Sequence, residues 1–203
     1  MDAILALYTE ALPWGHEVHN FDETPKQLLS TPHGGYAPKR GVYRKLDYEY
    51  KRNGRRNIFV AVAPFKGTRT VQVTERRTAV DTADFLWNYC MVIHREVHHI
   101  HLVLDNLNTH TETSLRKVWG AEKAQQFFVR VTLHFTPPHA SWLNMAELEI
   151  NALKTQGLKR RIGTEIEMQR IADAIVRERN GRRATITWGF TSARAREKFP
   201  VLY

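Results

Sequence analysis

Three acidic residues are the best candidates for chemistry in this chain of 203 residues. Asp105 follows the apolar run 102–104, and Asp22 ends a shorter candidate strand. Each therefore stands where open α/β sheets place their reactive groups. Glu147 lies in segment 141–153, whose apolar spacing predicts a helix. Three carboxylates that converge from two strands and a helix would bind a pair of divalent cations, which can hold the attacking and leaving oxygens of a phosphodiester.

Each acid taken alone has a simpler interpretation. Aspartates often form turns or cap helices, and most helical glutamates are solvated. Glu149, two residues after Glu147, is the alternative third acid, because one of the two is expected to face inward. The acids indicate a metal site only as a set, in which bound cations offset the mutual repulsion of the carboxylates.

The positive charge of the chain points to a polyanionic partner. Lys and Arg total 30 against 21 Asp and Glu, a formal net charge of +9. Residues 39–56 hold eight basic residues and two acids, and residues 154–198 hold twelve and five. Tyrosines interleave the first cluster, which suits nucleic acid better than a merely solvated surface. We expect Lys51, Arg52, Arg55 and Arg56 to contact DNA phosphates.

Composition excludes several other classes. Hydrophobic residues at 42% and charged residues at 25% are typical of a folded globular domain. The single cysteine, Cys90, excludes an intrachain disulfide and a cysteine-based metal cluster. No apolar run is long enough to cross a bilayer and no secretory signal is evident, so we expect no membrane partner and a cytoplasmic location. His99 and His101 would share one face of a strand, where a strand edge is favoured over a zinc site.

The elements that must position the acids form a mixed pattern of strands and helices. The dipeptide Asn53-Gly54 predicts a hairpin between strands at 47–51 and 56–63, and a strand at 69–75 would complete an antiparallel meander. Residues 23–46, rich in Pro and Gly, are expected to form a loop. Further strands are expected at 17–22, 100–104 and 129–135, and helices at 3–12, 78–93, 113–118, 121–128, 141–153 and 164–181. In the helix at 78–93, one face would carry Phe85, Leu86, Tyr89, Cys90 and Ile93, and Gly157 is expected to stop the helix at 141–153. This order predicts an α/β fold, with a mixed sheet flanked by helices.

Four segments carry a resemblance to a known family. Residues 22–28, 47–54, 102–110 and 136–147 closely resemble the DDE transposases of bacterial insertion sequences, in the insertion sequence 630 family of the mariner-like superfamily. The motifs occur in family order, and the run 102–110 is the most specific. The resemblance covers residues 17–203, including the tail around Trp188 and Phe190.

The resemblance implies an RNase H-like catalytic domain at 17–203, preceded by a residual linker at 1–16, with the family's N-terminal helix-turn-helix region absent. It assigns catalysis and metal binding to Asp22, Asp105 and Glu147, with two Mg²⁺ ions and Mn²⁺ as a plausible substitute. The implied activity is cleavage of element ends followed by strand transfer into a target. The implied partners are double-stranded DNA, a second copy of the chain on that DNA, and a separate helix-turn-helix polypeptide. The implied location is the bacterial nucleoid.

An inactive remnant that binds DNA as a regulator of a complete transposase is the alternative function. It is motivated by the poorly apolar strand before Asp22 and by Pro138-His139-Ala140, where the family usually has Lys-His-Gly. The expected absence of the helix-turn-helix region, which recognises the inverted repeats in this family, also favours an inactive remnant. A ribonuclease on the same fold is a third interpretation.

Overall fold

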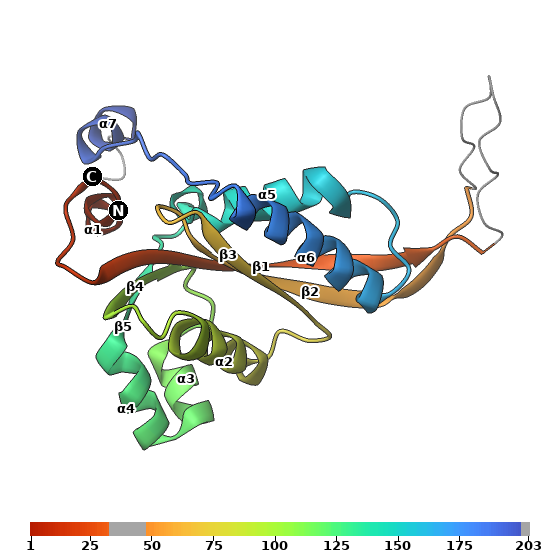
Figure 1. The fold of residues 1–203 in the computed structure, drawn as a ribbon, viewed down its shortest axis with the longest axis horizontal. Helices are drawn as coiled ribbons and strands as arrows, with labels where there is room; N and C mark the ends of the chain where they lie inside the picture. The colour runs from red at the N-terminus through yellow and green to blue at the C-terminus, as the bar shows by residue number, and fades with distance from the viewer. Residues whose placement is uncertain (33–47, 200–203) are drawn as a thin grey trace.

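The computed structural model describes residues 1–32 and 48–199, and its centre is a five-stranded sheet (Figure 1). The strand order is β3-β2-β1-β4-β5. Strands β1 (His16–Ser30), β2 (Lys51–Ala63) and β3 (Thr68–Thr74) form an antiparallel meander. Strands β4 (His99–Leu104) and β5 (Val131–Phe135) continue the sheet in parallel from the first part of β1. The predicted mixed sheet is confirmed, with β1 at its centre.

Helices cover both faces of this sheet (Figure 1). One face carries α2 (Ala79–Trp87), the π-helical turn η1 (Asn88–Ile93), α3 (Glu112–Trp119) and α4 (Ala121–Arg130). The other carries α5 (Ala146–Leu153), the π-helical turn η3 (Lys154–Leu158) and α6 (Glu165–Gly181). Near both chain ends lie α1 (Asp2–Thr9), the 3-10 turn η2 (Ser141–Leu143) and α7 (Ser192–Lys198). None of the helices in the described ranges combines the length and apolar character needed to cross a membrane.

Strand β1 begins with polar residues that are nevertheless fully buried. His19 and Asn20 are 0% exposed. The His19 Nδ1 atom lies 2.8 Å from the Tyr89 hydroxyl, and Asn20 Nδ2 donates to the Tyr8 hydroxyl at 2.6 Å. Because His19 and the Asn20 amide N–H find partners on opposite faces of the sheet, a strand with few apolar residues can occupy its middle, although the buried Asn20 Oδ1 has no hydrogen-bond partner among the described residues. Tyr8 belongs to α1, so the segment 1–16 contains a helix that packs on the sheet.

The outer half of the meander differs from the prediction. Residues 23–30, expected to be a loop, continue β1 as a strand, while residues 33–47 lie outside the described ranges. Asn53-Gly54 is no hairpin turn but lies inside β2, where the pairing with β1 shifts register between Gln27 and Leu29. Gly54 has a φ of +89°. Asn-Gly readily adopts the left-handed conformation, which occurs both in hairpin turns and in β-bulges. Here the pairing of β2 with β1 continues on both sides of the dipeptide, so it forms an irregularity within a strand and not a turn.

The helix at 79–93 is capped as predicted but changes its geometry. Thr78 and Asp81 form the reciprocal capping box. Of the expected inward face, Phe85, Leu86, Tyr89 and Cys90 are buried, whereas Ile93 is 48% exposed. The chain widens into the π-helical turn η1 at Asn88–Ile93. A π-helical turn holds more residues than an α-helical turn, so the later residues rotate away from the predicted stripe.

The segment predicted as one helix over 141–153 is two pieces. The turn η2 ends at Leu143, Asn144 has an extended ψ of 107°, and α5 begins at Ala146. Gly157 does not stop the helix but lies within η3, where an added Cβ would come within 2.6 Å of the Ile171 side chain on α6. Helix α6 follows its predicted bounds closely, and the described residues include one more helix, α7.

Candidate active site

The sheet brings Asp22 and Asp105 together. Strands β1 and β4 are parallel, and Asn20 is paired with Val103. Asp22 and Asp105 each lie two residues further along, so the register continues to them. Side chains alternate between the faces of a strand, which places both acids on the face of Asn20 and Val103. Asp105 directly follows β4, as predicted, whereas Asp22 lies inside β1, so the prediction that Asp22 ends its strand was wrong. The parallel pairing of β1 with β4 brings these two distant segments side by side.

Helix α5 supplies the third acid on that same face. It packs against β1 and β2. Asn144, 1% exposed, donates through Nδ2 to the Phe21 carbonyl at 2.7 Å and accepts from the Ala146 backbone N–H at 3.1 Å. This residue joins the start of α5 to the residue before Asp22. Glu147 and Asp22 consequently line one pocket of about 320 Å³, together with Glu23, Thr24, Ile150, Asn151 and Lys154.

Electrostatics ties the three acids into one site. Burial raises the pKa of Asp22, the Glu23 backbone N–H partly opposes this at 2.7 Å, and the charges of Asp105 and Glu147 raise it further, to about 7. In the described part of the chain, no basic side chain forms an ion pair with Asp22 or Glu147. The pocket therefore holds carboxylates without ion-pair partners among the described residues, and Lys154 is the basic residue in its lining.

Glu149, the alternative third acid, has a different environment. Its side chain is 2% exposed and faces away from the pocket lining. Arg69 Nε lies 3.0 Å from one carboxylate oxygen, and Arg179 Nη2 lies 2.8 Å from the other. Two guanidinium groups thus neutralise Glu149 and join β3, α5 and α6. One acid of α5 is turned inward, as expected, and it is the one that holds the helix in place.

Two further residues contact the acids from the opposite sheet face. His110 is fully buried, and its Nδ1 lies 2.6 Å from Asp105 Oδ1. Its Nε2 lies 3.4 Å from Glu23 Oε2. Burial alone would lower the pKa of His110, but the hydrogen bonds and charges of Asp105 and Glu23 outweigh it and raise the pKa to about 9. Two signals for these residues are present in the sequence: His110 lies in the polar turn after Asp105, and Glu23 adjoins Asp22.

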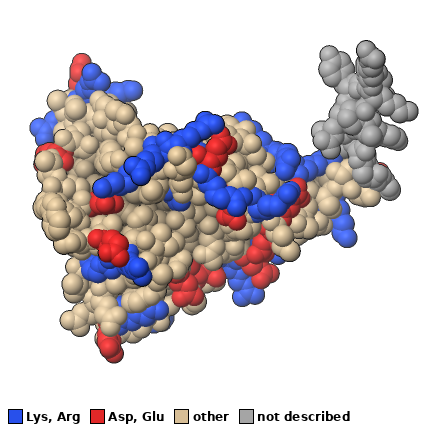
Figure 2. Space-filling view, in the orientation of Figure 1, with Lys and Arg blue, Asp and Glu red and all other residues tan. Residues whose placement is uncertain are grey.

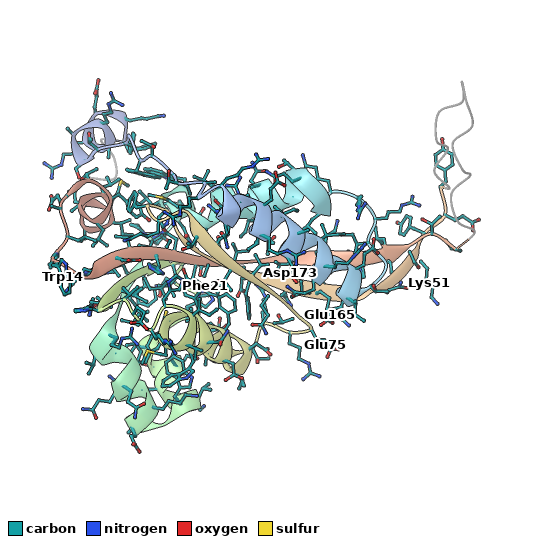
Figure 3. The ribbon with its side chains drawn as sticks, in the orientation of Figure 1. Trp14, Phe21, Lys51, Glu75, Glu165 and Asp173 are labelled. Atoms are coloured by element: carbon teal, nitrogen blue, oxygen red, sulfur yellow. The ribbon has the colours of Figure 1, made fainter. Side chains whose placement is uncertain are left out.

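The predicted phosphate-binding residues lie at one end of the molecule. Lys51, Arg52 and Arg55 are exposed on the outer part of β2. Figure 3 marks this end of the strand by Lys51. Arg56 differs, because it forms an ion pair with Glu165 at the start of α6. Charge also gathers elsewhere: Figure 2 shows Lys and Arg side chains spread over the α6 face. There a groove of about 550 Å³ between η3 and α6 is lined by Gln156, Gly157, Arg160, Arg170, Ile171, Ala174, Ile175 and Arg177.

The histidines of β4 share a face, as predicted. His101 Nε2 lies 3.1 Å from His16 Nδ1, and His101 Nδ1 lies 3.1 Å from His134 Nε2. Burial and the neighbouring imidazoles lower the pKa of His101 to about 4. Within residues 1–32 and 48–199, no group of three or more potential ligands is arranged to hold a metal ion, and this applies to the histidines and to the three acids alike.

The donor set of the acid pocket nevertheless fits a hard divalent cation. Carboxylate oxygens are the ligands that Mg²⁺ prefers. Asp22 and Glu147 line the pocket, and the charge of Asp105 acts on Asp22 although Asp105 is not part of the lining. Burial and, to a smaller extent, the charges of Asp105 and Glu147 raise the pKa of Asp22, and both effects disfavour its ionised form. The residues therefore suit a metal whose charge would offset these effects.

A mixed five-stranded sheet with helices on both faces is the architecture of the RNase H-like fold. The chain belongs to the DDE superfamily endonuclease family, which matches residues 17–169. Comparison with curated protein sequences gives no significant match.

Solved structures of Mos1 transposase share the fold. The paired-end complex with the left transposon end has a TM-score of 0.56 at 11% identity, and covers 84% of this chain and 52% of that chain. The strand transfer complex has a TM-score of 0.55 at 12% identity, with coverages of 89% and 56%. The isolated catalytic domain has a TM-score of 0.51 at 13% identity, with coverages of 84% and 82%. The chain spans about half the length of the Mos1 chains in the complexes, and identities this low establish the fold alone.

Proposed function

We propose that this chain is the catalytic core of a DNA transposase of the insertion sequence 630 family, which cleaves the ends of a mobile element and joins them to target DNA. The observation that carries the proposal is the acid pocket. Asp22 is largely buried, and the charges of Asp105 and Glu147 raise its pKa. The membership of the DDE superfamily endonucleases supports the same assignment.

Asp22, Asp105 and Glu147 are the proposed catalytic residues, and they would hold two Mg²⁺ ions, for which Mn²⁺ can substitute. When bound, such a pair supplies an activated attacking oxygen and a stabilised leaving oxygen for phosphodiester chemistry. The protein's own contribution would be to present the three carboxylates to these ions from β1, the end of β4 and α5. With a pKa of about 7, Asp22 holds a proton on a substantial fraction of molecules at neutral pH and releases it when a cation binds.

Double-stranded DNA, as element ends and as target, is the proposed substrate and partner. The Mos1 paired-end complex, which shares the fold, contains the left transposon end. Two basic surfaces support DNA binding on this chain: the outer part of β2 with Lys51, Arg52 and Arg55, and the groove between η3 and α6 with three arginines. The second adjoins the acid pocket, because α5 and η3 are continuous and Lys154 of η3 lines that pocket. A homodimer on DNA and a separate helix-turn-helix polypeptide complete the proposal.

The test is cleavage of an end-labelled duplex that carries the inverted repeat found in the DNA flanking the gene. The full chain is incubated with this duplex and Mg²⁺ or Mn²⁺, and products are resolved on a denaturing gel. We expect strand cleavage that requires the metal and falls to background in Asp105→Ala. Asp84→Asn, a change at an exposed aspartate of α2, is the matched control and should cleave like the wild type.

Other outcomes assign other functions. DNA binding without metal-dependent cleavage, also when a helix-turn-helix polypeptide encoded upstream is added, would support the inactive regulatory remnant. Cleavage of an RNA–DNA hybrid in preference to duplex DNA would support a ribonuclease. Cleavage undiminished in Asp105→Ala would show that the acid pocket is not the active site.

A further inference from the structure

His110 is a histidine that no DNA substrate can touch directly, yet it contacts the proposed site. Its side chain is 0% exposed. The residue lies at the end of the turn that follows β4, where the His110 backbone N–H donates to the Leu107 carbonyl at 2.9 Å. The imidazole is thereby directed back under Asp105, on the sheet face opposite to the acid pocket.

The two ring nitrogens of His110 face acids on two different strands. Nδ1 donates to Asp105 Oδ1 at 2.6 Å, and Nε2 faces Glu23 Oε2 at 3.4 Å. Glu23 is 3% exposed, and its other oxygen accepts from Arg77 Nη1 at 3.0 Å. Asp105, His110, Glu23 and Arg77 therefore form one chain of contacts, which runs from the proposed metal ligand to the surface.

The same imidazole is fixed by the strand that carries Asp22. Phe21 and Glu23 flank Asp22 on β1 and, by alternation, point to the face opposite to the Asp22 side chain. The Phe21 ring packs edge-on against His110 with centroids 5.2 Å apart. Figure 3 shows Phe21 directed from β1 toward the α2 side of the sheet. Phe21 and Glu23, the two neighbours of Asp22, therefore both contact His110, and His110 in turn is hydrogen-bonded to Asp105.

We propose that His110 is a positioning residue that sets the placement of the Asp105 carboxylate relative to Asp22, and that Glu23 holds His110 for this purpose. The inference rests on the proposed function. The physical reason is that Asp22 and Asp105 repel each other, and the Asp105 side chain, 32% exposed, has no other side-chain partner in the described part of the chain. A buried hydrogen bond to one of its oxygens fixes the carboxylate rotamer before a cation arrives.

The experiment measures Mn²⁺ binding to the full chain without DNA. Free Mn²⁺ is followed by electron paramagnetic resonance during a titration at one pH. Outer residues that orient metal ligands typically contribute 10–100-fold to metal affinity. We expect His110→Ala to weaken Mn²⁺ binding by about 10–100-fold. His110→Asn should recover part of this loss, because an asparagine amide can replace Nδ1 as the donor to Asp105 but cannot also reach Glu23. His99→Asn, at the other end of β4, is the matched control and should bind like the wild type.

The dependence between His110 and Glu23 gives a second readout. Glu23→Gln should weaken Mn²⁺ binding by less than His110→Ala. Because Glu23 acts through His110, the double variant should bind no more weakly than His110→Ala alone. Thermal unfolding in EDTA, followed by circular dichroism, checks that each variant is folded. If His110→Ala does not fold, His110→Asn and Glu23→Gln carry the test, and both should show a reduced affinity.

The outcomes separate this inference from the proposed function. Loss of Mn²⁺ binding in Asp105→Ala, together with unchanged binding in the folded His110 and Glu23 variants, would overturn the positioning role and leave the metal site standing. Additive effects of His110→Ala and Glu23→Gln would also overturn it. Undiminished Mn²⁺ binding in Asp105→Ala would overturn the metal site itself, and the positioning role with it.

Discussion

At the scale of single residues, Asp22 carries an energetic cost in the absence of metal. The folded chain holds this carboxyl largely out of water and near two other acids, which raises its pKa to about 7. An unfolded chain would ionise it near the ordinary value of about 4. Between these two values the folded state binds more protons, so the free energy of unfolding falls as pH rises. Above pH 7 the destabilisation is complete.

Asp22→Asn is therefore expected to stabilise the metal-free protein at alkaline pH. The gain should be on the order of 2–4 kcal/mol at pH 8.5 and should shrink toward zero near pH 4, where both states are protonated. Chemical denaturation in EDTA across this pH range is the measurement. Asp84→Asn serves as control, since Asp84 is exposed on α2. A gain that does not depend on pH would contradict the assigned cause.

Substitutions of Glu147 and Glu149 should have opposite effects: the first should abolish cleavage, and the second should lower the free energy of unfolding. Glu147 is exposed at the pocket, so Glu147→Gln should change the free energy of unfolding by less than about 0.5 kcal/mol while it removes metal-dependent cleavage. Glu149 is buried between Arg69 and Arg179, and Glu149→Gln leaves buried positive charge unbalanced, at a cost of about 3–5 kcal/mol. Urea denaturation and the cleavage assay measure the two effects. The reverse assignment, with Glu149→Gln stable and inactive, would contradict the proposed third acid.

At the scale of elements, the start of α5 is joined to β1 by a single side chain. Asn144 uses its amide N–H to reach the Phe21 carbonyl and its oxygen to receive the Ala146 N–H. The extended conformation of Asn144 interrupts the predicted helix and changes the direction of the chain. Helix α5 consequently begins beside Asp22, and its first turn carries Glu147 into the pocket.

Asn144→Ala should remove both hydrogen bonds that join the start of α5 to β1. It leaves a buried carbonyl and a helix N-terminus without partners, which costs about 1–3 kcal/mol in the free energy of unfolding. Cleavage should fall as well in the molecules that stay folded, because Glu147 loses its fixed position relative to Asp22. Denaturation and cleavage by the purified variant are the measurements. Asn88→Ala, at an exposed asparagine that ends α2, is the control. Full cleavage activity in folded Asn144→Ala would show that the hydrogen bonds of Asn144 do not position Glu147.

At the scale of the whole molecule, basic surfaces surround a small acidic pocket. The formal net charge is +9, and Figure 2 shows Lys and Arg side chains over the α6 face, with Asp and Glu side chains among them. Asp22, Glu23 and Glu147 line the acid pocket. In the groove on α6, Arg170 and Arg177 form no ion pair with any residue of the described ranges. Such side chains are available to phosphates, and their contribution to affinity depends on salt.

Arg170→Gln combined with Arg177→Gln should reduce the salt dependence of DNA binding. Each phosphate contact contributes about 0.9 to the slope of log K against log salt concentration, so the double variant should lose close to 2 from the slope. Binding of a labelled duplex by fluorescence anisotropy from low to high salt is the measurement. Arg95→Gln is the control, because Arg95 pairs with Glu96 on the surface. An unchanged slope would remove the groove from the DNA path and leave the β2 end as the proposed contact.

Local patterns were sufficient to predict much of this protein. The apolar run before Asp105, the capping box at Thr78, the N-cap at Thr164 and the meander strands 56–63 and 69–75 were predicted correctly, because propensity and periodicity act over a few residues. The same patterns failed at Asn53-Gly54, at Gly157 and at the strand beyond Asp22. At each of these positions a partner from elsewhere in the chain, β1, α6 or β2, decides the conformation.

The identity of the candidate acids was thus present in the sequence, and their convergence was not. Which acid of α5 faces the pocket depends on where two arginines, 80 residues before and 30 after it, meet Glu149. The placement of Asp105 beside Asp22 depends on the register of two parallel strands and on a buried histidine under the sheet. Contacts between distant segments are made only when the chain folds, so the tertiary structure alone determines which side chains share a site.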